Sequence, residues 1–233
     1  MVKQIINLII SSLLFLFISC SNSSEMLLPE LVSPDIYKVL LDNDDVKVLE
    51  VTFGPGQSDN MHDHNPVTFY LVEGGKAQVT LPDGTVNERE IPTGFTGHNA
   101  DKVRHQVKNI GENTIKIILV EHKKIRSKSS TINKDYLFPE KVSPDVYKVL
   151  LENDNIKVLE VEFEPGQGDN MHDHNPMIAY VIQGGKAQAT LPDGTTNERE
   201  VPSGVSFFAK DGQRHQIKNI GDNTIKILLV EYK

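Results

Sequence analysis

Six of the chain's eight histidines fall into two sets of three with the same spacing. The sets are His62, His64 and His105, and His172, His174 and His215. Side chains two residues apart on a β-strand point to the same side, so each His-x-His pair places two imidazoles a few ångströms apart. A third imidazole from another strand completes a facial set that can bind a divalent transition metal. The intervening Asp63 and Asp173 are expected to point the other way.

The two histidine sets lie in two copies of one sequence. Pro29–His122 aligns with Pro139–Tyr232 at a constant offset without a gap, and about two-thirds of the pairs are identical. A repeat of this length indicates a duplicated domain and not the short unit of a solenoid. We therefore predict domains over residues 29–122 and 139–233. The linker between them, residues 123–138, is basic and serine-rich, which suits a solvated segment.

Each copy has the pattern of an all-β domain. In the first copy, Tyr37–Leu41 and Val46–Phe53 flank a run of turn residues and predict a hairpin. A second hairpin is predicted over residues 76–91, around the turn Pro82-Asp83-Gly84, and another strand over residues 113–120. No segment has the pattern of an amphipathic helix. Several short strands separated by glycine and proline indicate a sandwich or a barrel.

Around the histidines the sequence resembles the cupin superfamily. The first cupin motif, Gly-x5-His-x-His, is matched by Gly56, His62 and His64 and by Gly166, His172 and His174, and the second by His105 and Asn109 and by His215 and Asn219. The likeness covers nearly all of the chain after residue 28. It implies two tandem cupin-like (jelly-roll-like) β-barrels, a bicupin, with a metal at the mouth of each barrel. Each half is similar to small single-domain cupins that have no assigned reaction.

One departure from the family pattern affects the ligand set. Where cupins carry a metal-binding glutamate, this chain has Val67 or Thr68 in the first copy and Met177 or Ile178 in the second. The resemblance then implies a site of three neutral imidazoles, with the remaining positions open to water or to a ligand. A further protein ligand, such as Tyr70 or Asn60, stays an alternative.

Six other residues are candidates for a ligand pocket: Tyr70, Tyr180, Arg104, Arg214, His98 and Phe208. The two arginines stand beside the third histidine of each set and could bind a carboxylate through two parallel hydrogen bonds. A strand-end arginine is also a common surface charge. His98 has no histidine counterpart in the second copy, where Phe208 takes its place. No residue can be named as catalytic from the sequence.

The N-terminus resembles the signal of a bacterial lipoprotein. Lys3 precedes an apolar stretch that is too short for a comfortable membrane span, and the stretch ends at Ser19-Cys20. We predict a signal peptide over residues 1–19, lipidation of Cys20, and a tether over residues 20–28. The protein would then be exported and lipid-anchored to the bacterial envelope, on its periplasmic or outer-membrane face. A buried N-terminal helix is the alternative.

The net charge of −8 argues against a nucleic-acid partner, which would require a basic surface. We expect one divalent ion per domain, with zinc, copper or nickel favoured over iron(II) because three imidazoles lack a hard oxygen ligand. The expected partner is a small anionic molecule, and the second copy is the preferred site because its mouth positions are more apolar. Three functions stay open: a metal-dependent lyase or isomerase, a three-histidine iron dioxygenase, and a non-catalytic ligand-binding or interaction module at the membrane.

Overall fold

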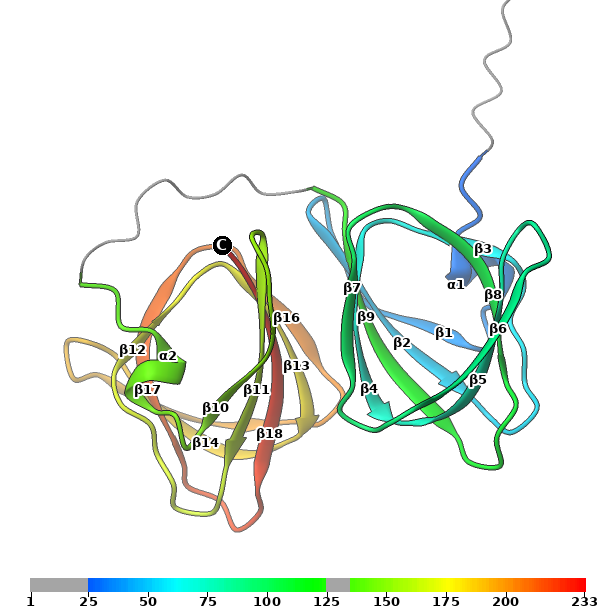
Figure 1. Ribbon diagram of the computed structural model, residues 1–233. Coiled ribbons are helices and arrows are strands. Elements are labelled where there is room, and N and C mark those ends of the chain that lie inside the picture. Colours follow the sequence, from blue (N-terminus) through cyan, green and yellow to red (C-terminus); the bar gives the residue numbers. More distant parts are fainter. Residues whose placement is uncertain (1–24, 125–134) are drawn as a thin grey trace, which may run out of the picture.

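The computed structural model describes residues 25–124 and 135–233, which form two domains of the same all-β architecture (Figure 1). The predicted signal peptide, Cys20 and most of the predicted linker lie outside these residues. Within the described residues, no helix is both long and apolar enough to cross a membrane.

Domain 1 begins with one turn of helix and continues with nine strands. These are α1 (Pro29–Val32), β1 (Tyr37–Asp42), β2 (Val46–Phe53), β3 (His62–His64), β4 (Val67–Glu73), β5 (Gly75–Thr80), β6 (Val86–Ile91), β7 (Thr96–Asn99), β8 (Val103–Asn109) and β9 (Ile115–His122). A five-stranded sheet has the order β1-β2-β9-β4-β7, and a four-stranded sheet has the order β3-β8-β5-β6. The inner faces of the two sheets enclose an apolar core.

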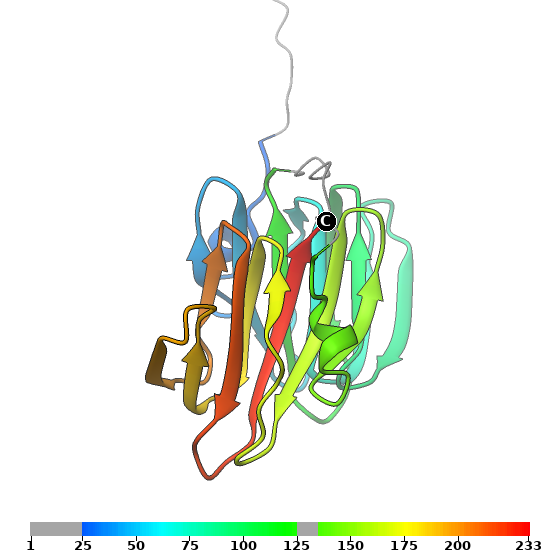
Figure 2. The ribbon, with the colours of Figure 1, turned by 90° about the vertical axis from the view of Figure 1, so that its left-hand side faces the viewer.

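Domain 2 repeats this order. Its elements are α2 (Pro139–Val142), β10 (Tyr147–Glu152), β11 (Ile156–Phe163), β12 (His172–His174), β13 (Met177–Gln183), β14 (Gly185–Thr190), β15 (Thr196–Val201), β16 (Ser206–Ala209), β17 (Gln213–Asn219) and β18 (Ile225–Tyr232). The sheets are β10-β11-β18-β13-β16 and β12-β17-β14-β15. The last strand, β18, therefore lies in the middle of its sheet (red in Figure 2).

Local chemistry explains the two predicted hairpins, which the structure confirms. In the turn between β1 and β2, Asn43 Oδ1 accepts hydrogen bonds from the backbone N–H of Asp45 and Val46 at 2.8 and 3.0 Å. Between β5 and β6, Gly84 has a φ of 85°, a left-handed conformation that glycine adopts without strain. These turns set the registers that direct apolar side chains inward.

The two five-stranded sheets pack against each other through their outer faces. Their shared apolar cluster includes Val48 and Ile118 from domain 1 and Val158 and Leu228 from domain 2. The contact is nearly two-fold symmetric, since β1 lies against β16 and β10 lies against β7. The domain boundary is therefore a third hydrophobic core, separate from the two barrel interiors.

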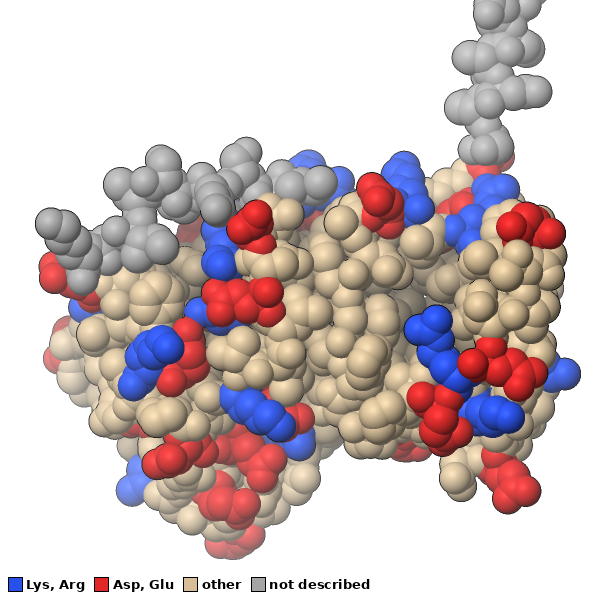
Figure 3. Space-filling model, viewed as in Figure 1, with Lys and Arg blue, Asp and Glu red and all other residues tan. Residues whose placement is uncertain are grey.

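Charged groups of both signs are interspersed on the molecular face shown in Figure 3. The described residues form no continuous basic patch on that face.

Candidate metal centres

In domain 1 the three predicted histidines meet at one point. His62 and His64 project from β3, and His105 is the cross-strand partner of His62 on β8. Their ring centroids are 4.6, 4.8 and 5.3 Å apart. One ring nitrogen from each lies within 4.8 Å of the other two. The strand register thus brings together residues that are 41 or more positions apart in the sequence.

Hydrogen bonds to the outer nitrogens fix which ring nitrogens carry protons. Nδ1 of His62 lies 2.7 Å from the backbone oxygen of Asn60, which can only accept, so Nδ1 is protonated and Nε2 has a free lone pair. Nδ1 of His64 lies 2.6 Å from Oε1 of Glu121 and is placed to donate to it in the same way. The two Nε2 atoms face each other at 2.8 Å. Two lone pairs at this distance repel, and a cation that both can bind relieves the repulsion.

Domain 2 reproduces the arrangement with His172, His174 and His215. The ring centroids are 4.6, 4.9 and 5.1 Å apart, and the two Nε2 atoms of the His-Asp-His pair are again 2.8 Å apart. Nδ1 of His172 donates to the oxygen of Asn170 at 2.8 Å, and Nδ1 of His174 lies 2.5 Å from Oε1 of Glu231. The donor set in both domains therefore fits a divalent transition metal.

Burial keeps four of the six imidazoles neutral, which is the form that binds metals. It lowers the pKa of His62 to about 4 and the pKa of His105 to about 3, with repulsion from neighbouring imidazoles adding to the effect. In domain 2, burial lowers the pKa of His174 and of His215 to about 3. A metal ion therefore does not have to displace protons from these rings at neutral pH.

A buried glutamate behind each site was not predicted from the sequence. Glu121 on β9 is fully buried, and it is the cross-strand partner of Val67, the position at which a family glutamate was expected. Its Oε2 atom is buried without a hydrogen-bond partner. A carboxyl group therefore lies one imidazole away from the site.

In domain 2, burial raises the pKa of Glu231 to about 8, with the nearby ammonium of Lys157 acting in the opposite direction. A bound cation favours the ionised form of this carboxyl group. The signal that could have revealed both glutamates is a charged residue on the inward-facing phase of an otherwise apolar strand, as in Ile115–His122.

A tyrosine–aspartate pair beside each triad was also missed. The hydroxyl group of Tyr37 donates to Oδ2 of Asp59 at 2.7 Å and lies 3.1 Å from Nε2 of His62. Tyr147 and Asp169 form the same contacts with His172 in domain 2, at 2.8 and 3.1 Å. Both aspartates are buried, and burial raises the pKa of Asp59 to about 6. Each site thus has a hydroxyl group at its edge whose proton is already shared with a carboxylate.

The predicted pocket arginines lie away from the triads. Nε and Nη2 of Arg104 donate to the two carboxylate oxygens of Asp63, both at 2.6 Å. Asp63 points to the opposite side of β3 from His62 and His64, as the strand alternation predicted. Arg214 and Asp173 pair in the same way in domain 2, at 2.7 and 2.6 Å. The bidentate geometry expected for a substrate carboxylate is thus made with a carboxylate of the protein itself.

The predicted tyrosines lie at the domain boundary. The hydroxyl group of Tyr70 donates to Glu160 of domain 2 at 2.8 Å, and that of Tyr180 donates to Glu50 of domain 1 at 3.1 Å. Burial, together with the neighbouring glutamate, raises the pKa of each phenol well above its ordinary value, so both remain protonated donors. Among the described residues, neither tyrosine contacts a triad.

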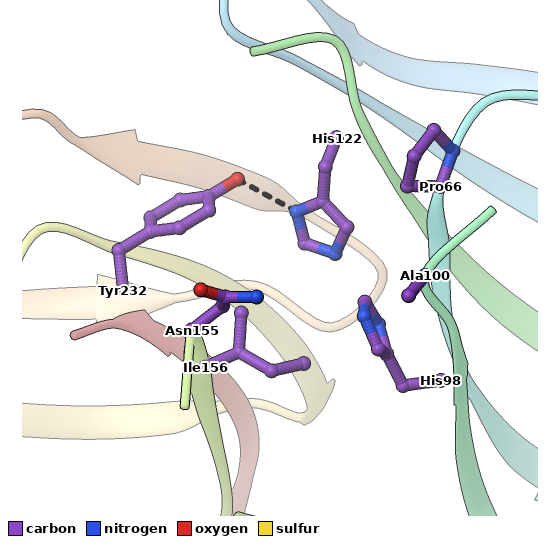
Figure 4. A pocket seen from close by; sticks show the side chains of 7 residues that line it. All are labelled: Pro66, His98, Ala100, His122, Asn155, Ile156 and Tyr232. Carbon is purple, nitrogen blue, oxygen red and sulfur yellow. Dashed lines mark hydrogen bonds between the residues drawn. The ribbon is translucent and has the colours of Figure 1, made fainter. Parts of the chain in front are cut away.

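His98 lines a pocket of about 50 Å³, but this pocket lies between the domains (Figure 4). Thr68 Oγ1 lies 3.0 Å from Nδ1 of His98 and 2.8 Å from Nε2 of His122, and Nδ1 of His122 lies 2.9 Å from the hydroxyl of Tyr232. His98, His122 and Tyr232 thus belong to one hydrogen-bonded chain that crosses the boundary. Phe208, the residue of domain 2 at the position of His98, packs against the apolar cluster between the domains.

A second cavity, of about 80 Å³, lies inside the barrel of domain 2. His174 and His215 form part of its wall, so it adjoins the candidate metal centre. Arg199 is the one charged side chain among its described lining residues, and most of the others are aliphatic or aromatic. The triad in this domain therefore faces a space that could receive a small molecule.

Comparisons with known proteins agree on the fold. No family model matches the chain, and no curated protein sequence matches it significantly. AerE from Microcystis aeruginosa is 12% identical with a TM-score of 0.58, and the match covers 85% of this chain and 97% of that one. A deletion mutant of Bacillus subtilis oxalate decarboxylase is 15% identical with a TM-score of 0.58, covering 81% and 69% of the two chains.

A further structure of the Bacillus subtilis enzyme, in a study of its Mn(II) centres, is 15% identical with a TM-score of 0.56 and covers 84% and 74% of the chains. At these identities the likeness shows the fold alone. The predicted fold class is confirmed: the chain consists of two tandem cupin-like β-barrels, and each contains three histidines that could bind a metal ion.

Proposed function

We propose that this protein binds one divalent transition-metal ion at each histidine triad and that the metal in domain 2 binds a small anionic molecule. The observation that carries the proposal is the pair of Nε2 lone pairs 2.8 Å apart in each domain, held in place by hydrogen bonds at Nδ1. An all-nitrogen set favours zinc, copper or nickel, and iron(II) is the next choice.

The test is the metal content of the purified protein after export-competent expression. Wild type should contain about two ions per chain, one for each triad. The variants His62→Ala/His64→Ala and His172→Ala/His174→Ala should each lose one ion. His98→Phe/His122→Tyr is the matched control, because it also removes two histidines but places the residues of the other domain there, and it should lose none. A double variant of a triad that keeps its full metal content would contradict the proposal for that domain.

An enzymatic role is the second candidate, and the Tyr147–Asp169 pair favours it. A bound metal would supply Lewis acidity or, as iron(II), a site for oxygen chemistry. The chain's own contribution would be the hydroxyl of Tyr147, which lies 3.1 Å from a ligand nitrogen and can exchange its proton with Asp169 at 2.8 Å. Tyr147→Phe should then abolish turnover of a substrate while the bound metal stays. A non-catalytic binder would show no turnover in either form.

Export and lipidation are proposed from the sequence of the N-terminal segment. A lipid anchor on Cys20 would hold both barrels at the surface of an envelope membrane. Cys20→Ser should move the protein from the membrane fraction to the soluble fraction. Unchanged membrane association would contradict lipidation at this residue.

A further inference from the structure

The cavity in domain 2 has two chemically different ends. One end contains His174 and His215, and Arg199, the cross-strand partner of Ala187, is the one charged side chain among the described residues of the wall. The remaining lining side chains are mainly apolar and include Ala187, Ala189, Val201, Phe207, Ile217 and Ile227. A molecule that fills this cavity must therefore present an anionic or metal-binding group to one end and hydrocarbon to the rest.

An exchange of one aromatic ring distinguishes the two barrels. In domain 1, Phe69 on β4 packs into the barrel core and is the cross-strand partner of Gly97 on β7. A Cβ atom on Gly97 would lie 2.3 Å from the ring of Phe69, so the ring covers this glycine closely. In domain 2 the same pair is Ala179 and Phe207. The phenyl ring is thus supplied by the opposite strand.

This exchange places the ring differently in the two domains. Ala179 is fully buried and leaves the inner position with a methyl group only. Phe207 lines the cavity and is 38% exposed, so its ring stands where the cavity meets solvent. At the inner position that Phe69 fills in domain 1, domain 2 therefore has the small side chain of Ala179, and the ring of Phe207 lies at the edge of the cavity.

We propose that domain 2 binds a monocarboxylate with a short, unbranched hydrocarbon tail. The carboxylate lies at the metal of the triad, Arg199 supplies the positive charge of the cavity wall, and the tail lies against Ala189 and Ile217 under the ring of Phe207. This assignment rests on the proposed metal at His172, His174 and His215, whose charge attracts the carboxylate. Domain 1 would bind the carboxylate group without a gain from the tail, because Phe69 occupies the corresponding space.

The experiment compares straight-chain acids from acetate to octanoate by calorimetric titration of the zinc-loaded, full-length protein. The variant His62→Ala/His64→Ala silences domain 1, so that domain 2 holds the remaining metal. Each added methylene that enters the cavity should raise the affinity about fourfold until the cavity is full. Longer chains should gain nothing more or bind less well.

Two further variants are made in the same background. Ala179→Phe/Phe207→Gly copies the pair that domain 1 already accommodates, so it should fold, keep its zinc and bind acetate normally, but lose the gain with chain length. Arg199→Gln should weaken all the acids by a similar factor and leave the increment per methylene unchanged. The zinc content of every sample is measured first.

Zinc-loaded protein whose affinity is independent of chain length would overturn the assignment while the proposed metal site stands. An increment that survives Ala179→Phe/Phe207→Gly would also overturn it, because the tail would then lie elsewhere. Failure of domain 2 to bind zinc would instead contradict the proposed function and the assignment that rests on it.

Discussion

The two domains differ little around the histidine triads and much on either side of them. The ligands and the groups that hold their outer nitrogens are the same residue types at the same separations, from Asn60 and Asn170 to Glu121 and Glu231. In contrast, only two of the ten pairs between residues 91–100 and 201–210 are identical. The metal-binding geometry depends on many mutual contacts, whereas the cavity wall can change by exchanging one pair of side chains.

The layer between the domains differs in polarity in a similar way. Domain 1 contributes Thr68, His98 and His122, and domain 2 has Ile178, Phe208 and Tyr232 at the same positions. The hydrogen-bonded chain therefore belongs mainly to domain 1 and ends at Tyr232 of domain 2. The comparison shows that equivalent positions in one pseudo-symmetric boundary can be either apolar or polar, provided that the polar groups find partners.

Removal of both metals should give the largest effect. A ligand present at about 1,000 times its dissociation constant stabilises the folded state by roughly 4 kcal/mol. Because the triads match, a chelator should lower the melting temperature of both domains by a similar amount, measured by calorimetry. His62→Ala/His64→Ala should remove the chelator response of domain 1 only. A wild-type melting temperature that is the same with and without the chelator would contradict metal binding.

Loss of the carboxylate behind each triad should weaken metal binding without abolishing it. Glu121→Gln and Glu231→Gln keep the shape of the side chain but remove the carboxyl group that contacts Nδ1 of His64 and of His174. Metal affinity should fall about 10- to 100-fold in the altered domain and stay unchanged in the other. Competition with a chromophoric chelator measures both sites. Unequal losses of metal affinity in the two domains would show that the two sites differ in function although their geometries match.

The hydrogen-bonded histidines between the domains should make the stability of the protein depend on pH. Burial lowers the pKa of His122 to about 4, with repulsion from His98 adding to the effect, and burial also lowers the pKa of His98. Since the unfolded state has an ordinary histidine pKa of about 6.5, it binds protons first as the pH falls. The contribution of these neutral histidines to the stability of the folded state is therefore fully present above pH 6.5 and is lost as the pH falls towards 4.

Thr68→Ile/His98→Phe/His122→Tyr gives domain 1 the residues of domain 2 and should remove this dependence. Near pH 7 its unfolding free energy should lie within about 1 kcal/mol of wild type, because a satisfied polar cluster is exchanged for an apolar one. Below pH 6.5 the unfolding free energy of the variant should rise relative to that of wild type by up to about 1.4 kcal/mol per pH unit for each histidine removed. Parallel stability curves from pH 7 to 4.5, measured by denaturant titration, would contradict this account.

The smallest effect is expected at the outer face of β3. Arg104 pairs with Asp63 at the protein surface, where solvent screens the ion pair, so Arg104→Ala should change stability little and leave metal content unchanged. The equivalent Arg214→Ala should behave alike. A clear loss of ligand affinity in either variant would support the prediction that these arginines bind a substrate carboxylate.

Local pattern was sufficient to predict the strands and the triads. The alternation and turn residues from Tyr37 to Phe53 predict the first hairpin, and the repeated His-x-His spacing predicts two imidazoles on one side of a strand. Residues that act through partners distant in sequence were harder to predict. Glu121 contacts His64 across 57 positions, and this contact depends on which strands are neighbours in the sheet.

The predicted pocket residues show the same limit. Tyr70 lies close in sequence to His64, but it belongs to the other sheet of the barrel, and its side chain points outward and reaches Glu160 of the other domain. That contact depends on how two separate domains dock, which alternation within one strand cannot reveal. Arg104 next to His105 faces away for the simpler reason that neighbouring residues on a strand point to opposite sides.

The most direct test of the central claim is anomalous diffraction from crystals of the metal-loaded protein, recorded at the absorption edges of zinc, copper, nickel, iron and manganese. The account predicts two peaks per chain, each about 2.0–2.1 Å from the Nε2 atoms of one triad, as in zinc–histidine sites. It favours the zinc, copper or nickel edge. Triads without a peak at any of these edges, or a peak bound by other residues, would contradict the claim that these histidines form the metal centres.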